Sequence, residues 1–146
     1  VVTLDGGVQV RVIAGTALGV AGAVTRPTTE PLVLDIALPA GQLFDALLPA
    51  GHNAFVYVYG GGIAVGDEAS GGASRVDPQR MAILANDPAA DGVRLTAVDL
   101  LQPTRVLLVA GQPLREPIAQ YGPFVMNTQA EIQQALTDFQ HGALAG

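Results

Sequence analysis

The sequence predicts an all-β domain of the jelly-roll type that is followed by one C-terminal α-helix. Short runs of apolar and β-branched residues recur along the chain, and glycine or proline turns separate them. Brief strands divided by turn residues are typical of antiparallel sandwiches and barrels, and a jelly roll is the natural closure for them. Near the end of the chain, a Thr-x-x-Glu pattern precedes apolar residues at helical spacing, which marks the helix.

Three strands are expected in the first third of the chain. The valines of residues 8–12 alternate with other residues, which is the period of a half-buried strand. Residues 32–38 and 43–48 are apolar runs, and a Pro-Ala-Gly turn follows each of them. These runs therefore predict separate strands joined by tight turns.

Residues 53–59 form the strongest strand by composition. Aromatic residues occupy one face of this strand and valines the other, which suits a pleated surface. The glycines at 60–62 are expected to turn the chain back into a hairpin partner at residues 63–65. The small, acidic and glycine-rich segment 66–74 is predicted to be a mobile loop.

Three further strands are expected before the chain becomes helical. They cover residues 80–85, 92–98 and 105–110. With no internal repeat and no second domain boundary, the chain is expected to be a single domain. The barrel would extend to about residue 112, and a C-terminal segment with the helix would follow over residues 113–146.

The helix is expected from about residue 129 to 141, with its apolar face laid on the barrel. Thr128 and Glu131 have the spacing of a capping box, and Gly142 stands where a left-handed residue would end the helix. The apolar stripe consists of Ile132, Ala135, Leu136 and Phe139.

The composition excludes several classes of function. The formal net charge is -6 and the 7 basic residues are scattered along the 146-residue chain, so nothing indicates binding to nucleic acid. Without cysteine, the chain has no disulfide, thiolate metal ligand or cysteine nucleophile. It shows no signal peptide, no apolar membrane span and no basic amphipathic stretch, so a cytoplasmic protein without a membrane partner is expected.

The most specific pattern lies in the C-terminal segment. Residues 122–128 read Gly-Pro-Phe-Val-Met-Asn-Thr, a mixture that no generic strand or helix rule dictates. Residues 51–58 read Gly-His-Asn-Ala-Phe-Val-Tyr-Val, and further blocks stand at residues 11–15 and 107–114. Together these blocks resemble the C-terminal half of the pirin family over nearly the whole chain. The resemblance implies a cupin-type jelly-roll β-barrel with one C-terminal α-helix.

The resemblance also implies that the two barrels of a pirin have different roles. Pirins consist of two cupin barrels in one chain, and the N-terminal barrel holds iron through three histidines and a glutamate. The C-terminal barrel packs against it and normally has no metal. Some bacterial members are similar to quercetin dioxygenases, and animal members act as iron-dependent transcriptional co-regulators. This sequence lacks the N-terminal barrel, so iron is expected only in a barrel outside it.

The sequence predicts no catalytic residue and a degenerate metal site. Aligned with an active cupin, the His-x-His positions fall at about Leu47 and Pro49, and the glutamate falls at about residues 53–54. Leucine and proline side chains cannot ligate a metal. The two histidines, His52 and His141, lie on distant predicted elements.

Ten residues are candidates for a partner interface or a cavity. Each group has a structural alternative. His52 and Asn53 could form a polar patch at the barrel mouth or close a turn, and residues 115–116 could bind a partner or tether the backbone. Residues 121–127 could form a docking surface, or could plug the barrel end and cap the helix. The candidates are His52, Asn53, Tyr57, Tyr59, Arg115, Glu116, Tyr121, Phe124, Met126 and Asn127.

Three functions are consistent with these residues. The leading hypothesis is a metal-free domain with a binding or structural role, which packs on a metal-bearing N-terminal pirin barrel or associates with itself as a homodimer. The second is a fragment of an iron-dependent quercetin 2,3-dioxygenase-like pirin. The third is a small-molecule-binding barrel whose cavity Tyr57 and Tyr59 would line.

Overall fold

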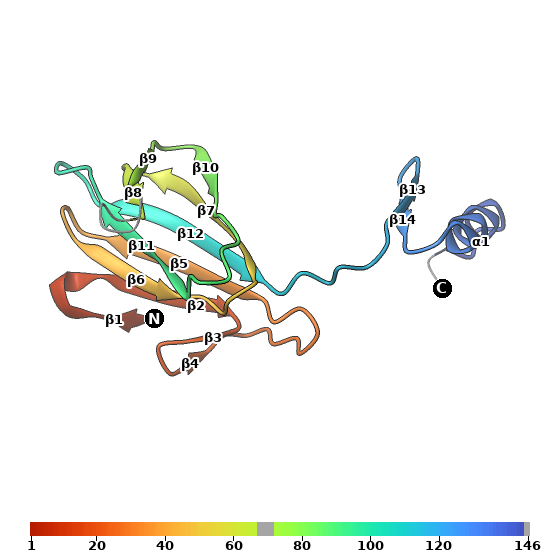
Figure 1. The fold of residues 1–146 in the computed structure, drawn as a ribbon, viewed down its shortest axis with the longest axis horizontal. Helices are drawn as coiled ribbons and strands as arrows, with labels where there is room; N and C mark the ends of the chain where they lie inside the picture. The colour runs from red at the N-terminus through yellow and green to blue at the C-terminus, as the bar shows by residue number, and fades with distance from the viewer. Residues whose placement is uncertain (67–71, 145–146) are drawn as a thin grey trace. The chain divides into compact units, whose positions relative to one another are not determined.

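The structure is a computed structural model, and it describes residues 1–66 and 72–144. The chain divides into two compact units, of which the first is Val1–Pro113 and the second begins at Leu114. The first unit contains two facing sheets, and the second contains a hairpin and the helix (Figure 1).

The larger sheet of the first unit has six strands in the order β1-β2-β5-β12-β7-β10, and neighbouring strands run antiparallel. Its strands are β1 (Val2–Thr3), β2 (Gln9–Ala14), β5 (Leu32–Leu38), β12 (Thr104–Gly111), β7 (Asn53–Gly60) and β10 (Arg80–Ile83). The short 3-10 helix η1 (Asp5–Gly7) joins β1 to β2, and the small hairpin of β3 (Thr16–Ala17) and β4 (Val20–Ala21) follows β2.

The smaller sheet has four antiparallel strands in the order β6-β11-β8-β9. They are β6 (Leu43–Leu47), β11 (Gly92–Ala97), β8 (Ile63–Val65) and β9 (Ser74–Val76). On β6 and β11, Asp45 accepts two hydrogen bonds from Arg94, at 2.7 and 2.8 Å. These hydrogen bonds lower the pKa of the Asp45 carboxyl below its usual value.

The chain alternates between the two sheets, which makes this a jelly roll. From β5 to β8, each successive strand belongs to the other sheet, and β10, β11 and β12 alternate in the same way. The core therefore lies between the sheets. Side chains on alternate positions of β5, β7 and β12 are buried there. The largest fully buried side chains include Leu34, Ile36, Leu38, Ile63, Leu95 and Leu108.

The expected hairpin between residues 53–59 and 63–65 is wrong. β8 pairs with β11 and β9 in the smaller sheet, not with β7. Gly61 has a φ of +64°, and a Cβ there would lie 2.8 Å from the Thr104 hydroxyl oxygen. The buried Thr104 hydroxyl donates to the Gly62 carbonyl at 2.8 Å. The glycines thus carry the chain across to the facing sheet instead of reversing it.

The other strands expected from the sequence are confirmed, with ends that move by a few residues. The strand expected at 32–38 matches β5, and the runs at 53–59 and 105–110 each extend slightly as β7 and β12. Residues 74–76, the first of which was expected to be loop, form β9. The central part of that loop, residues 67–71, lies outside the described residues.

The second unit consists of the hairpin β13 (Ala119–Tyr121) and β14 (Phe124–Met126), followed by α1 (Gln129–Gln140). Thr128 caps the helix, and the expected capping box with Glu131 is present in both directions. Hydrogen bonds from Thr128 lower the pKa of Glu131. In the described residues, no helix is long and apolar enough to cross a membrane.

The apolar stripe of the helix is only partly buried. Ile132 and Ala135 are buried, whereas Phe139 is exposed on much of its surface. Within the second unit, β13 and β14 are the strands that pack against α1. Phe124 of β14 meets the Phe139 ring edge to face, with centroids 6.0 Å apart.

Candidate functional site

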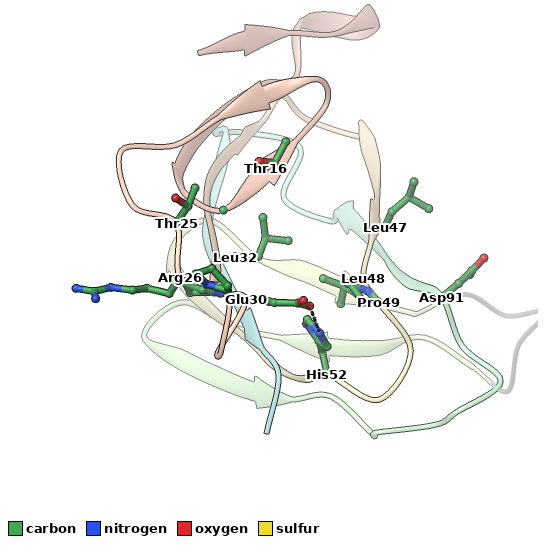
Figure 2. A pocket seen from close by; sticks show the side chains of 13 residues that line it. Thr16, Thr25, Arg26, Glu30, Leu32, Leu47, Leu48, Pro49, His52 and Asp91 are labelled. Carbon is green, nitrogen blue, oxygen red and sulfur yellow. Dashed lines mark ion pairs between the residues drawn. The ribbon is translucent and has the colours of Figure 1, made fainter. Parts of the chain in front are cut away.

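A pocket of about 690 Å³ opens at one end of the first unit (Figure 2). At this end β2 and β6 finish and β5 and β7 begin. The walls come from the end of β2, the connection before β5 and the loop between β6 and β7. The side chains that matter for its chemistry are Thr16, Glu30, Leu32, Leu48, Pro49 and His52.

Gly15 explains how two walls of this pocket come together. Its φ is +77°, and a Cβ at this position would lie 2.3 Å from the Pro31 carbonyl oxygen. Only glycine allows the backbone to approach so closely. The end of β2 therefore lies directly against the residues that lead into β5.

His52 and Glu30 form the polar centre of the pocket. His52 Nε2 lies 3.3 Å from Glu30 Oε2, and Figure 2 shows the two side chains pointing toward each other. The His52 side chain is 7% exposed and the Glu30 side chain is 55% exposed. In the described part of the chain, the buried His52 Nδ1 has no hydrogen-bond partner. The pair thus joins a buried imidazole to a carboxylate that faces the pocket.

Glu30 also has an unusual backbone. Its φ is +40°, in the left-handed region that residues with a side chain rarely adopt. Its amide donates to the Arg26 carbonyl at 2.8 Å, which closes the turn before β5. Residues held in such conformations are concentrated at functional sites.

The residues at this end of the unit do not fit iron. The positions aligned with the His-x-His ligands, Leu47 and Pro49, are apolar residues at the pocket wall. Within residues 1–66 and 72–144, no cluster of three or more His, Asp or Glu side chains could hold a metal ion. His52 with Glu30 supplies two donors, fewer than an iron site of the facial-triad kind needs.

Asn53 follows His52 but makes a different contact. Its Oδ1 accepts a hydrogen bond from Asn86 Nδ2 at 2.9 Å, and the same Asn86 amide donates to the Gly51 carbonyl. Asn53 therefore fastens the start of β7 to the loop that follows β10. It does not line the pocket that contains His52.

Tyr57 and Tyr59 lie on the outer face of the six-stranded sheet. They alternate along β7 with Val56 and Val58, which point into the core. To line a cavity between the sheets, the two tyrosines would have to lie on the face of β7 that points into the core. The Tyr59 hydroxyl reaches across β12 and donates to Asp35 Oδ1 at 2.5 Å. Partial burial, assisted by this hydrogen bond, raises the pKa of Tyr59.

The two tyrosines belong to a largely apolar surface, which we call the outer sheet face. It is formed by the outward positions of β2, β5, β7, β10 and β12. Ile83 is 79% exposed there, and the other members are partly or largely exposed. The apolar and aromatic members are Ile13, Val33, Phe55, Tyr57, Tyr59, Met81, Ile83, Leu107 and Val109.

The remaining candidates all lie in the second unit. Glu116 accepts a hydrogen bond from Asn127 Nδ2 at 2.7 Å, which ties the segment before β13 to the start of the helix. Arg115 is exposed, with a φ of +55°. Tyr121 is exposed at the hairpin, whereas Phe124 and Met126 are half-buried.

Glu30 was not among the residues predicted from the sequence. It precedes Pro31 in a turn of threonines and prolines, a context that reads as an ordinary loop. Its importance depends on a long-range fact: β5 and β7 both pair antiparallel with β12, so both strands begin at the same end. Only that topology places residue 30 beside residue 52.

Known proteins similar to this chain share both its sequence and its fold. The family described as the pirin C-terminal cupin domain matches residues 33–145. A Pseudomonas aeruginosa protein named "Putative quercetin 2,3-dioxygenase" is 44% identical over 96% of this chain and 47% of its own length. Pirin from Mus musculus is 40% identical over 92% of this chain and 44% of its own length.

A solved structure agrees with these sequence relatives. The crystal structure of quercetin 2,3-dioxygenase from Acinetobacter baumannii has a TM-score of 0.81 and 36% identity, and it matches 100% of this chain and 47% of its own. The chain thus spans less than half the length of the relatives it matches. By sequence and by fold, this chain belongs to the pirin family as a C-terminal cupin domain.

Proposed function

We propose that this domain has a binding role, in which the outer sheet face packs on a metal-bearing cupin barrel of the pirin type. The chain corresponds to only 47% of the Pseudomonas relative, so a protein of that kind has room for a second barrel. In this role the domain contributes no metal ligand. In its own pocket, leucine and proline occupy the positions aligned with cupin ligands, and His52 is the only histidine among the lining residues.

The outer sheet face is the observation that carries this proposal. Monomeric proteins rarely leave a continuous apolar patch of more than a few hundred Å² in water, and such patches mark interaction sites. Here aromatic and aliphatic side chains from five adjacent strands share one face of a rigid sheet. The charged residues among them are few, with Arg11, Asp35 and Arg105 at outward positions.

A second candidate is that the whole protein is an iron-dependent quercetin 2,3-dioxygenase-like pirin. The names of the Pseudomonas relative and of the Acinetobacter structure favour it. The reaction would then take place in the other barrel, and this domain would support that barrel by covering it. The two candidates differ in the activity of the partner, not in the part this domain plays.

The proposal predicts that the 146-residue chain alone buries its outer sheet face by forming a homodimer. Ile83 lies on the edge strand β10 of this face, and Ile83→Glu would place a charge in the buried contact, so this variant should be a monomer at all concentrations. Leu101→Glu is the matched control, because Leu101 is 97% exposed in the turn before β12 and belongs to none of the strands that form that face. Size-exclusion chromatography with light scattering over a range of concentrations measures both.

The comparison of Ile83→Glu with Leu101→Glu tests whether the outer sheet face is the surface that forms the dimer. Dimers of the parent chain and of Leu101→Glu, with monomers of Ile83→Glu, would support a partner-binding face. A parent chain that remains monomeric at every concentration, or dimers that Ile83→Glu leaves intact, would contradict it.

A further inference from the structure

We propose that the pocket around His52 and Glu30 binds a small uncharged molecule with an apolar body and a hydroxyl group, which donates a hydrogen bond to the Glu30 carboxylate. The site lies at the strand ends of the first unit, whereas the outer sheet face lies on the broad side of the larger sheet. The inference is therefore independent of the binding role proposed above.

The size and lining of the pocket suit such a ligand. Its volume of about 690 Å³ falls within the range of roughly 300–1,000 Å³ typical of small-molecule sites. Leu32, Leu48 and Pro49 provide apolar walls (Figure 2). An apolar body would gain by leaving water for these walls.

The His52–Glu30 pair determines which polar group a ligand must carry to bind in this pocket. His52 engages Glu30 Oε2 from the buried side, and no donor from the described residues engages Oε1. A ligand donor can therefore reach the carboxylate from the open side. Figure 2 shows the side chains of Arg26 and Asp91 directed away from this centre, so Glu30 is the acceptor that faces the ligand.

The same geometry argues against charged ligands. An anion would meet the Glu30 carboxylate with no cationic side chain directed toward it, in a chain of net charge -6. A cation would have to give up its hydration among apolar walls, and His52 already provides the carboxylate with a partner. A hydroxyl costs less to desolvate and still donates a hydrogen bond.

Two unfavourable features at the pocket support a binding role over a merely structural one. His52 Nδ1 is buried without a partner in the described residues, and Glu30 keeps a left-handed backbone although it has a side chain. Native structures leave few buried polar atoms unsatisfied, and backbone strain is concentrated at ligand sites. Both features occur in the His52–Glu30 pair.

Naphthol is a suitable probe, with naphthalene, naphthoate and naphthylmethylamine as comparisons that lack the hydroxyl or carry a charge. Titrations of the 146-residue chain followed by calorimetry and by NMR should show one saturable site for naphthol. The ring signals of His52 and the methyl signals of Leu48 should shift. Naphthol should bind more tightly than any of the three comparison compounds.

Two variants test the assigned residues. Glu30→Gln keeps the shape of the exposed side chain but removes its charge, and it should weaken naphthol binding roughly tenfold, since hydrogen bonds to ionised acceptors are the stronger ones. Glu116→Gln is the matched control, because Glu116 lies in the second unit, and it should leave binding unchanged. Leu48→Trp should block the pocket, with circular dichroism to check that the variant is folded.

Several results would overturn the proposal. These are no saturable binding of naphthol, binding that leaves His52 and Leu48 unshifted, and an affinity that Glu30→Gln does not change. Tighter binding of naphthoate or naphthylmethylamine would overturn the uncharged class. None of these results depends on the dimer measured with Ile83→Glu, so the two proposals fail separately.

Discussion

At the scale of single residues, the hydrogen bond between Tyr59 and Asp35 links two strands that are not neighbours in the sheet. Tyr59 belongs to β7 and Asp35 to β5, and β12 lies between them. The bond therefore resists shear across three strands on the outer sheet face. Because the hydroxyl must stay protonated to donate, this link depends on pH.

Folding should become less favourable at alkaline pH because of Tyr59. Its pKa is raised above the ordinary value of 10.0 in the folded chain, so the folded state holds the proton more tightly than the unfolded state. The contribution to stability is complete below the unfolded pKa and is lost as pH rises through the folded pKa. Tyr59→Phe should remove this part of the pH dependence and lower stability at neutral pH by about 1 kcal/mol.

Urea unfolding at about pH 8 and about pH 11, on either side of the ordinary tyrosine value, measures the effect. Tyr57→Phe is the matched control, since it removes a hydroxyl from the same strand and face. If the parent chain and Tyr59→Phe lost the same free energy of unfolding between the two pH values, the alkaline loss of stability would not come from Tyr59.

At the scale of elements, the helix shows how a local signal produces local structure. Thr128 accepts from the Glu131 amide at 3.2 Å, and Glu131 Oε2 accepts from the Thr128 amide at 2.8 Å. Thr128→Ala removes the first of these and should cost about 0.5–2 kcal/mol of helix stability. Amide hydrogen exchange along residues 129–140 would report this as faster opening of the helix.

A serine at the same position keeps the capping oxygen. Thr128→Ser should therefore retain most of the protection that Thr128→Ala loses. If Thr128→Ala and Thr128→Ser increased amide exchange in the helix equally, the side-chain oxygen of residue 128 would not be stabilising the start of the helix.

The strands could be predicted from the sequence wherever burial alternates along one strand. β5 and β7 were found in this way, since each has one face in the core and one outside. Pairing could not be predicted, because glycines at 60–62 allow either a tight hairpin or a crossing to the facing sheet. The three-residue strands β9, β13 and β14 are too short to show a period.

At the scale of the whole molecule, the family and the fold could be predicted from the sequence, but the candidate site could be predicted only in part. His52 stood out because histidine is rare in this chain. Glu30 did not, because its contact with His52 depends on the parallel alignment of β5 and β7 across β12. The outer sheet face likewise becomes visible only when five strands are placed side by side.

In the described residues, no cluster of three or more His, Asp or Glu side chains could hold a metal ion, which is consistent with the supporting role proposed for this domain. Leu47 and Pro49 occupy the positions aligned with cupin ligands, and His52 with Glu30 supplies only two donors nearby. If the domain covers a second barrel, its apolar outer sheet face is the surface that would be buried.

The most direct test is the intact mass of the native protein together with its iron content, measured on the same sample. The account predicts a chain roughly twice as long as these 146 residues, since they match 47% of the Pseudomonas relative, with about one iron per chain. It also predicts no stoichiometric iron on the 146-residue chain alone. Iron bound by that isolated chain, and lost in a His52→Phe variant, would contradict the account.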